Sequence, residues 1–324
     1  MDVDQKDIEE HVDAQEQGQD AAQDTPERKE KKKKIRPYHR IHAHRNPLSD
    51  APMEYPPNPA EMDWSKLYPK PFADYEEAKK TDSTLAPPQV QMADIGCGYG
   101  GLSMALSRLY PSRLTLGMEI RPKVVKYVQQ RLDELRELKY DTMEDVPKTG
   151  GPHPIIQIDH PDLTSHTVAP NTPTFVPLAF PMYHNVSVIE SNAMKFLANF
   201  FFKGQLDKIF FLFPDPHFKK TKYRLRIINS TLLAEYAYVL RVGGIAYIAT
   251  DVKDLFDWMY SHFDEHPLFE KIPDEQEAQD PCVPLICGSS EESRKVKKQG
   301  GSIWHATFRR VEYAGKDFIP IPRD

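Results

Sequence analysis

The pattern of apolar residues divides the chain into three parts. Residues 1–34 contain no aromatic side chain, residues 35–88 carry isolated aromatic residues between prolines, and regularly spaced apolar segments begin at residue 89. Short apolar runs predict buried strands, and apolar residues three and four positions apart predict helices. The predicted strands are residues 90–95, 114–120, 186–189, 208–213 and 245–250, and the predicted helices are residues 102–110, 122–138, 193–199 and 230–240.

Strands and helices alternate in this region, which predicts an α/β domain with a parallel sheet covered by helices on both faces. Pro122 occupies the first position expected of a helix. Residues 141–184 hold many Pro and His without periodicity, and therefore predict an insertion. We expect a disordered acidic tail over 1–34, an extended segment packed on the domain over 35–88, and the domain with its insertion over 89–324.

Composition excludes several classes of protein. No apolar run approaches the roughly 20 residues of a membrane helix, and the N-terminus lacks an apolar signal region, so we expect neither membrane spanning nor secretion. The three cysteines Cys97, Cys282 and Cys287 form no C-x-x-C pair. Their spacing argues against a disulfide framework and a structural zinc site, and indicates a reducing compartment.

The net charge of −6 over 324 residues conceals an uneven distribution. Residues 1–30 carry −8 and residues 141–190 carry −5, which leaves +7 for the rest of the chain. A basic body indicates a nucleic-acid partner in spite of the acidic total. The four lysines at 31–34, which end the tail, have two open interpretations: an import signal or nucleic-acid patch, and a merely solvated stretch.

A glycine-rich turn follows the first predicted strand. Gly96, Gly98 and Gly101 fit the pattern G-x-G-x-x-G, and Glu119 ends the second strand, where an acidic residue would hold ribose hydroxyls. This pattern alone leaves a nicotinamide dinucleotide, S-adenosylmethionine and a purely structural turn open.

Further residues favour S-adenosylmethionine. Asp94 precedes the turn, Gly100 makes the glycine spacing denser, and residues 239–244 are expected to form a loop after a helix. Asn192 and Ala193 follow the third predicted strand and would flank the adenine, although Asn192 can also cap the helix that begins there.

The most specific segment is residues 211–226, FLFPDPHFKKTKYRLR, after the fourth predicted strand. Open α/β sheets place their chemistry at the carboxyl ends of parallel strands. Prolines on both sides hold Asp215 rigidly, and a dense cationic run follows at once. The alternative is a turn aspartate followed by a solvated basic helix.

Together with ADIGCGYGG at 93–101, EIR at 119–121 and NAMK at 192–195, this segment resembles the tRNA (guanine-N7-)-methyltransferases, in particular their eukaryotic catalytic subunit. Residues 40–47, 61–64, 232–236 and 266–270 resemble the same branch, and the resemblance covers residues 38–313 except the insertion. It implies a Rossmann-like α/β fold of the class I S-adenosylmethionine-dependent methyltransferases, with a mostly parallel seven-stranded sheet.

The resemblance also implies site residues. Asp215 matches the active-site aspartate of the family. With Gly98 from the glycine pattern, the predicted cofactor contacts are Gly96, Gly98, Glu119, Arg121, Asn192, Ala193, Leu212, Ser290 and Glu292. We expect RNA phosphates to be held by Lys219, Lys220, Lys222, Arg224 and Arg226. Two residues differ from the family pattern: Ser290 replaces a threonine, and Tyr223 replaces a residue that is usually histidine.

The chemistry expected of this site needs no general base, because guanine N7 already carries an in-plane lone pair. Asp215 would orient the base by accepting hydrogen bonds from its N1–H and N2–H₂ groups, once the base has left its stack. His217 is then interpreted as a loop residue and Cys97 as a small loop residue rather than a nucleophile. The phenylalanines at 200–202, 210, 211 and 213 are interpreted as core packing rather than as base-stacking residues.

The predicted function is therefore methyl transfer from S-adenosylmethionine to N7 of a variable-loop guanosine in tRNA, in the nucleus and without a metal. The resemblance implies a heterodimer with a WD-repeat β-propeller subunit, and apolar residues expected to be exposed near 255–258 agree with such a partner. Two alternatives stay open: a dehydrogenase that uses the same glycine turn, and a non-catalytic RNA-binding scaffold that retains the fold. Asp215 and Glu119 argue against the scaffold.

Overall fold

A computed structural model describes residues 45–49, 52–137, 182–313 and 315. All of them belong to one compact unit, Pro37–Asp324. The predicted tail at 1–34, and all but the last three residues of the predicted insertion at 141–184, lie outside the described residues. In the described part of the chain, no helix has the length and apolar character needed to cross a bilayer.

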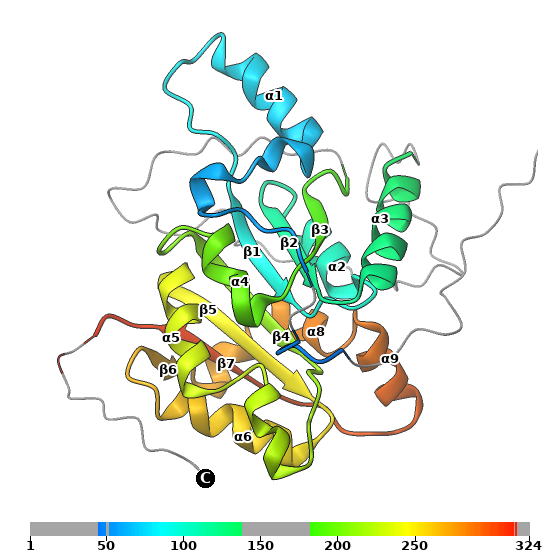
Figure 1. The fold of residues 1–324 in the computed structure, drawn as a ribbon, viewed down its shortest axis with the longest axis vertical. Helices are drawn as coiled ribbons and strands as arrows, with labels where there is room; N and C mark the ends of the chain where they lie inside the picture. Colours follow the sequence, from blue (N-terminus) through cyan, green and yellow to red (C-terminus); the bar gives the residue numbers. More distant parts are fainter. Residues whose placement is uncertain (1–44, 50–51, 138–181, 314, 316–324) are drawn as a thin grey trace, which may run out of the picture. The chain divides into compact units, whose positions relative to one another are not determined.

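The described residues form a seven-stranded sheet (Figure 1). Its strands are β1 (Val90–Ile95), β2 (Leu114–Glu119), β3 (Val186–Glu190), β4 (Leu206–Leu212), β5 (Leu240–Thr250), β6 (Phe269–Lys271) and β7 (Trp304–Arg310), in the order β3-β2-β1-β4-β5-β7-β6. Strands β1 to β5 pair in parallel, whereas β7 runs antiparallel to β5 and β6. The five strands predicted from the sequence are present, but the sheet is mixed rather than purely parallel. The strand order reverses between β1 and β4, and open α/β sheets bind their ligands at the carboxyl ends of the strands beside such a point.

Strand β5 begins at Leu240 rather than at residue 245. Residues 240–244, which were predicted to form a loop, therefore belong to the sheet. Gly243 takes a left-handed φ of 79° within the strand, and the register against β4 shifts between Leu206 and Lys208. The glycines thus accommodate an irregularity in the strand, not a connection after the helix.

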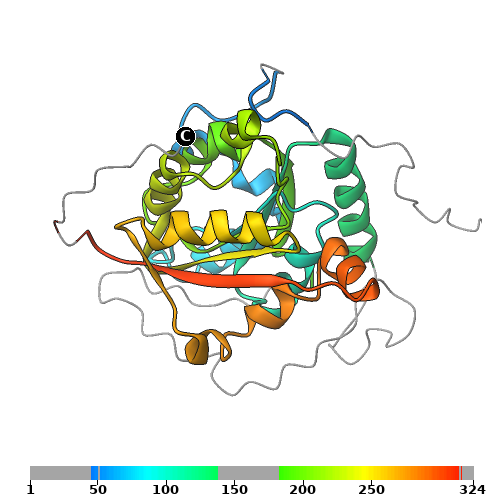
Figure 2. The ribbon, with the colours of Figure 1, turned by 90° about the horizontal axis from the view of Figure 1, so that it is seen from below.

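Helices cover both faces of the sheet, and Figure 2 shows α6 and α8 on opposite faces. One face packs against α4 (Ala193–Phe200), α5 (Ser230–Val239) and α6 (Lys253–Asp264), and the other packs against α2 (Gly101–Leu109), α3 (Pro122–Glu137) and α8 (Cys282–Ile286). The remaining helices are α1 (Pro69–Lys79), α7 (Asp274–Glu277) and α9 (Glu291–Lys298), with 3₁₀ helices at Pro59–Glu61, Trp64–Lys66 and Lys220–Leu225.

Alternate side chains of β4 pack against the helices on the two faces of the sheet. Phe211 packs against Tyr236 of α5, with ring centroids 4.6 Å apart, whereas Phe210 stacks on Tyr247 in the cluster that contains α2 and α8. Both phenylalanines are fully buried, as expected of a strand covered on both faces. The core-packing interpretation is confirmed for them and for residues 200 and 201, whereas Phe202 is 48% exposed.

The described residues before β1 lie along the domain. Tyr68 is completely buried, and its hydroxyl donates to the carbonyl of Thr115 in β2 at 2.7 Å. Three side chains at the start and along one face of α4 donate to backbone carbonyls of this segment: Asn192 to Pro47 at 2.5 Å, Lys195 to Ser49 at 2.8 Å, and Asn199 to Pro57 at 3.0 Å.

Candidate active site

The glycine-rich turn after β1 leaves open space beside its first two glycines. Gly96 and Gly98 adopt left-handed φ values of 72° and 54°, which favour glycine. A Cβ at Gly96 would meet no described atom within 4 Å, and one at Gly98 would meet only the carbonyl of Gly96. A Cβ at Gly101, in contrast, would lie 2.3 Å from the carbonyl oxygen of Ser289. Gly96 and Gly98 therefore allow a ligand to approach the backbone, whereas Gly101 makes room for another part of the chain.

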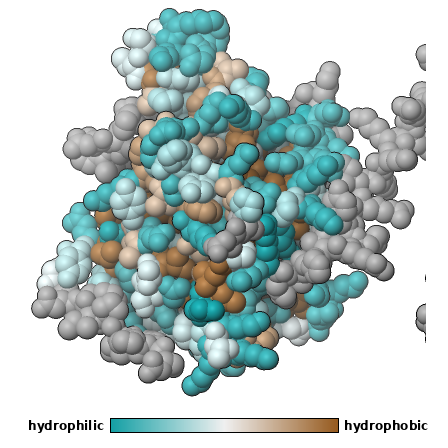
Figure 3. Space-filling view, in the orientation of Figure 1, coloured by the Kyte–Doolittle hydropathy of each residue, from teal (hydrophilic) through white to brown (hydrophobic). Residues whose placement is uncertain are grey.

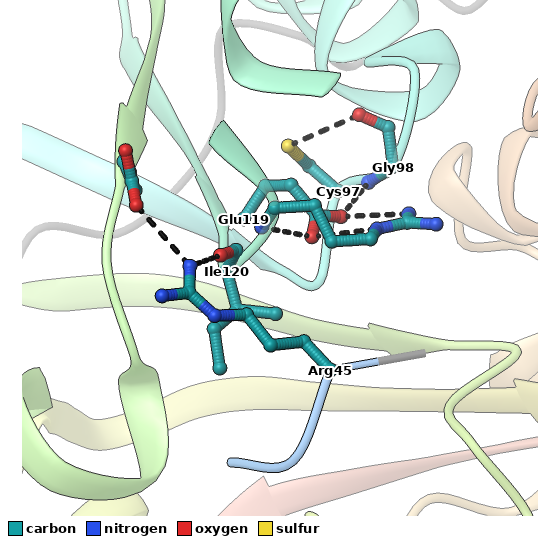
Figure 4. A network of polar contacts seen from close by, with 7 residues as sticks. Arg45, Cys97, Gly98, Glu119 and Ile120 are labelled. Carbon is teal, nitrogen blue, oxygen red and sulfur yellow. Dashed lines mark hydrogen bonds and ion pairs between the residues drawn. The ribbon is translucent and has the colours of Figure 1, made fainter. Parts of the chain in front are cut away.

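Glu119 ends β2 beside this turn and is 3% exposed. Its carboxylate accepts hydrogen bonds from the backbone N–H groups of Gly98 at 3.1 Å and Arg121 at 2.9 Å. The Arg121 side chain donates two more, from Nε at 3.0 Å and Nη2 at 3.1 Å (Figure 4). The structure thus brings three predicted cofactor residues together and fixes the carboxylate in one orientation.

Arg45, before the first helices, reaches the same edge of the sheet. Its Nη1 donates to the carbonyl of Ile120 at 2.6 Å and to Glu190 Oε1 at 3.3 Å (Figure 4). Arg45 therefore bridges the carboxyl ends of β2 and β3. The sequence placed Arg45 only within a family motif, because the pattern of this segment does not show which strands it crosses.

Asn192 links the end of β3 to the start of α4. Its Oδ1 accepts from the backbone N–H of Met194 at 3.1 Å, which confirms the helix-cap interpretation. Ala193 is the first residue of the helix and is 6% exposed. The predicted contact of these two residues with an adenine stays a prediction.

Asp94 is buried behind the glycine turn and is 2% exposed. The hydroxyl of Ser103 in α2 donates to its Oδ2 at 2.6 Å. Burial raises the pKa of Asp94 from 3.8 to about 7, in spite of the opposing hydrogen bonds from Ser103, and the charges of Glu119 and Glu291 add to the rise. Asp94 is thus a buried titratable group that links β1 to α2, the two elements on either side of the turn.

We expect the replacement of Asp94 by asparagine to change how stability depends on pH. Because the folded chain holds the proton more tightly than the unfolded chain, the contribution of Asp94 to stability falls as pH rises from about 4 to about 7. The free energy of unfolding of the wild type, minus that of Asp94→Asn, should therefore fall across this window and level off above it. Urea denaturation at a series of pH values measures this difference, and a difference that stays constant from about pH 4 to pH 8 would contradict the assignment.

A second turn, at residues 288–292, packs against the glycine turn. Ser290 caps α9 by accepting from the backbone N–H of Ser293 at 3.0 Å, and the Glu292 side chain is 58% exposed. Besides the Ser289 carbonyl, the side chain of Glu291 approaches the glycine turn, since its Oε2 would lie 2.9 Å from a Cβ at Gly101. Glu291 is thus closer to this turn than the sequence indicated.

Arg131 of α3 joins these two turns. Its Nη1 donates to the carbonyl of Tyr99 and to Glu291 Oε1, each at 3.3 Å. Arg131 was not among the predicted site residues, although its place in the helix pattern is unusual. Arg131 lies three residues after Val128 and next to Leu132, so a charged residue interrupts the buried stripe of the helix.

The loop after β4 carries Asp215 in a strained backbone. Leu212 ends the strand and is 9% exposed. Phe213 and His217 both take left-handed φ values, 49° and 44°, which cost about 1–3 kcal/mol each in residues other than glycine. Strain of this kind is concentrated at functional sites, and two of the three non-glycine residues with positive φ in the described part of the chain flank the segment that contains Asp215.

The charge of Asp215 acts on Arg121. Burial lowers the pKa of Arg121, but the hydrogen bond and charge of Glu119, with the charges of Tyr99 and Asp215, raise it more, so that the net shift is upward. The predicted active-site aspartate and the predicted cofactor residues therefore belong to one electrostatic environment.

The cationic run after Asp215 divides into exposed and buried members. Lys219, Lys220, Lys222 and Arg224 are exposed, whereas Arg226 is 4% exposed. Phe218, which no sequence pattern distinguished from core phenylalanines, exposes 70% of its surface among these cations. The prediction that Arg226 contacts phosphate stays untested, but its guanidinium has partners within the protein.

These residues fit S-adenosylmethionine, which needs open backbone for its amino-acid part and a carboxylate for its ribose. Gly96 and Gly98 supply the open backbone, and Glu119 supplies the carboxylate. Burial raises the pKa of the Cys97 thiol, which agrees with its interpretation as a non-nucleophilic residue. Among the described residues, no group of three or more His, Cys, Asp or Glu side chains could hold a metal ion.

Comparisons with known proteins show the family of the chain. A family model described as a putative methyltransferase matches residues 88–306. The tRNA (guanine-N(7)-)-methyltransferase of Homo sapiens is 46% identical over 281 residues, which cover 85% of this chain and 87% of the human protein. The enzyme of the same name from Dictyostelium discoideum is 45% identical, with coverages of 87% and 82%, and that from Candida glabrata is 46% identical, with coverages of 85% and 80%. The chain therefore belongs to the family of tRNA (guanine-N(7)-)-methyltransferases.

Proposed function

We propose that the protein transfers the methyl group of S-adenosylmethionine to N7 of a guanosine in the variable loop of tRNA. The observation that carries this proposal is the position of Asp215, on a strained loop between the Glu119–Arg121 pair and a run of exposed cations. The charge of Asp215 thus acts on a predicted cofactor residue, and a set of exposed cations follows Asp215 along the chain. The family to which the chain belongs supports the same reaction.

S-adenosylmethionine, when bound, supplies an electrophilic methyl group on sulfur. The N7 lone pair of guanine forms the new bond to the methyl carbon, and the electron pair of the broken bond stays on sulfur. No proton has to move, so the protein needs no general base. The positive charge arrives on the guanine ring, where a nearby carboxylate stabilises it.

Asp215 is the group that we assign to this stabilisation. A carboxylate accepts two hydrogen bonds side by side, which suits the adjacent N1–H and N2–H₂ donors of guanine. Prolines at 214 and 216 and the left-handed residues 213 and 217 restrict the conformations of the loop. The base is thereby oriented before reaction, and orientation is the main contribution that this chain makes to the rate.

The exposed side chains after Asp215 provide the RNA surface. Lys219, Lys220, Lys222 and Arg224 can neutralise phosphates, which gives affinity without sequence selection. Phe218, 70% exposed among them, offers an aromatic face on which an unstacked base can stack. An exposed ring surrounded by cations suits a looped or single-stranded part of an RNA.

Mapping of 7-methylguanosine tests this function. Unmodified tRNA is incubated with the purified protein and S-adenosylmethionine, with and without a WD-repeat subunit, and NAD serves as the control cofactor. We expect 7-methylguanosine at one variable-loop position, and none with NAD. Binding of tRNA without methyl transfer in both preparations would favour the non-catalytic scaffold.

We propose, from the family resemblance, that a WD-repeat β-propeller subunit binds the chain. Residues 255–258 do not support this, because Leu255 is 1% exposed and Trp258 is partly buried against the core, where its Nε1 donates to the carbonyl of Ile228. Exposed aromatic residues support it instead: Tyr55 is 48% exposed and stacks on Phe196 of α4, and Tyr238 of α5 is 47% exposed. Figure 3 shows hydrophobic residues scattered among hydrophilic ones on the face that is viewed in Figure 1. Co-purification of the subunit with the wild type, and its loss with Tyr55→Ser and Tyr238→Ser, tests the partner.

We also propose that the protein works in the nucleus, on the basis of the four lysines at residues 31–34. A fluorescent fusion should accumulate in the nucleus, and replacement of the four lysines by glutamine should reduce that accumulation. If the fusion with the four glutamines were distributed like the wild type, the four lysines would no longer support a nuclear location.

A further inference from the structure

The loop that carries Asp215 is held at both ends by groups outside it. At one end, the backbone N–H of Phe213 donates to the carbonyl of Ala249 in β5 at 2.7 Å. At the other end, Arg226 Nε donates to the carbonyl of Pro216 at 2.9 Å. Left-handed residues stand at 213 and 217, and such a conformation persists only where neighbouring contacts maintain it.

Arg226 is itself held by two aromatic rings. Its guanidinium carbon lies 3.9 Å from the centroid of the Tyr223 ring and 4.7 Å from that of Trp258. The two rings meet edge to face, with centroids 5.0 Å apart, and Trp258 Nε1 donates to the carbonyl of Ile228 at 2.8 Å. We call Tyr223, Arg226 and Trp258 the aromatic clamp.

Burial separates Arg226 from the other cations of its segment. Arg226 is 4% exposed, whereas Arg224, two residues earlier, is exposed. A phosphate contact would require Arg226 to give up its ring contacts and to leave the Pro216 carbonyl without this donor. Arg224 can reach a phosphate without such a loss.

We propose that Arg226 is a positioning residue that sets the place of Asp215, and that Tyr223 and Trp258 hold Arg226 for this task. The peptide bond between Asp215 and Pro216 is rigid, so a fixed Pro216 restricts Asp215 directly. Tyr223, at a position where the family usually has histidine, then holds Arg226 within the protein instead of contacting RNA. This inference rests on the proposed role of Asp215 in methyl transfer.

The test measures kcat and KM for tRNA in Arg226→Ala and in the matched control Arg224→Ala. We expect Arg226→Ala to lower kcat at least 10-fold and to leave KM for tRNA within about twofold. Arg224→Ala should raise KM for tRNA, make binding less dependent on salt, and leave kcat unchanged. If Arg226→Ala changed KM and its salt dependence but not kcat, Arg226 would be a phosphate contact and the proposal would be wrong.

Arg226→Ala in an Asp215→Ala background shows whether Arg226 acts by positioning Asp215 or by stabilising the protein in general. If Arg226 acts through Asp215, Arg226→Ala should lower kcat less than threefold in that background. Equal losses in both backgrounds would overturn the proposal. Full methylation by Asp215→Ala would overturn the proposed role of Asp215. Full methylation by Arg226→Ala, with a loss in Asp215→Ala, would overturn only the proposed role of Arg226.

Milder variants cover the possibility that Arg226→Ala fails to fold. Tyr223→Phe keeps the ring and should keep kcat. Tyr223→Leu removes the ring and should lower kcat severalfold, while the melting temperatures of the two variants stay close to each other. Equal kcat values for these two variants would contradict a role of the ring in holding Arg226.

Discussion

Replacement of Asp215 by alanine is expected to lower kcat for methyl transfer about 100-fold or more. The alanine removes the two acceptors proposed for guanine N1–H and N2–H₂ and the negative charge next to the ring that becomes positive. Loss of one such preorganised group at an enzyme site costs about 10²–10³ in kcat. Single-turnover methylation of tRNA measures the effect, and separate binding assays for tRNA and S-adenosylmethionine show whether affinity is retained.

Asp215→Asn is the matched control for the charge. Asparagine has nearly the same shape but turns one acceptor into a donor, so it opposes one guanine donor and carries no charge. Its kcat should fall to a value close to that of the alanine variant. A full methylation rate in either variant, with normal binding, would exclude the proposed role of Asp215.

Replacement of Gly101 by alanine is expected to destabilise the protein and to weaken binding of S-adenosylmethionine at least 10-fold. Gly101 does not need a left-handed φ, so the added methyl group is the whole difference. The methyl carbon would lie 2.3 Å from Ser289 O and 2.9 Å from Glu291 Oε2. The glycine turn and the turn at 288–292 must move apart, and overpacking of this kind costs about 1–3 kcal/mol or more. Thermal unfolding and calorimetric titration measure the two effects.

Gly300 offers a control for this substitution. It has a left-handed φ of 71°, but a Cβ there would meet no described atom within 4 Å. Gly300→Ala should therefore destabilise the protein by about 1 kcal/mol through backbone strain and leave cofactor affinity unchanged. Wild-type affinity for S-adenosylmethionine in Gly101→Ala would show that the contact between the two turns does not shape the cofactor site.

The sequence predicted the central strands and the helices between them because their patterns are local. Pro122 and the apolar stripe after it mark α3, and the helix begins at Pro122 in the structure. Asn192 was interpreted as a possible helix cap, and its side chain accepts from Met194 N as that interpretation requires. Such features depend on residues only a few positions apart, so a sequence carries them in full.

Contacts between distant segments were not predictable in the same way. The glycine pattern does not distinguish Gly96, which faces open space, from Gly101, which faces Ser289. The cationic run likewise does not show that Arg226 turns inward to Tyr223 and Trp258 while Arg224 stays exposed. Each distinction depends on a contact with a segment that is distant in the sequence: Ser289 for Gly101, and Trp258 for Arg226.

The hydrogen bonds from Asn192, Lys195 and Asn199 to the segment before α1 have an evolutionary consequence. These side chains are spaced by three and four residues, and all three donate hydrogen bonds to backbone carbonyls, those of Pro47, Ser49 and Pro57. A carbonyl is present whatever side chain its residue carries. These three hydrogen bonds therefore tolerate a change of side chain at positions 47, 49 and 57, whereas they require the side chains at positions 192, 195 and 199.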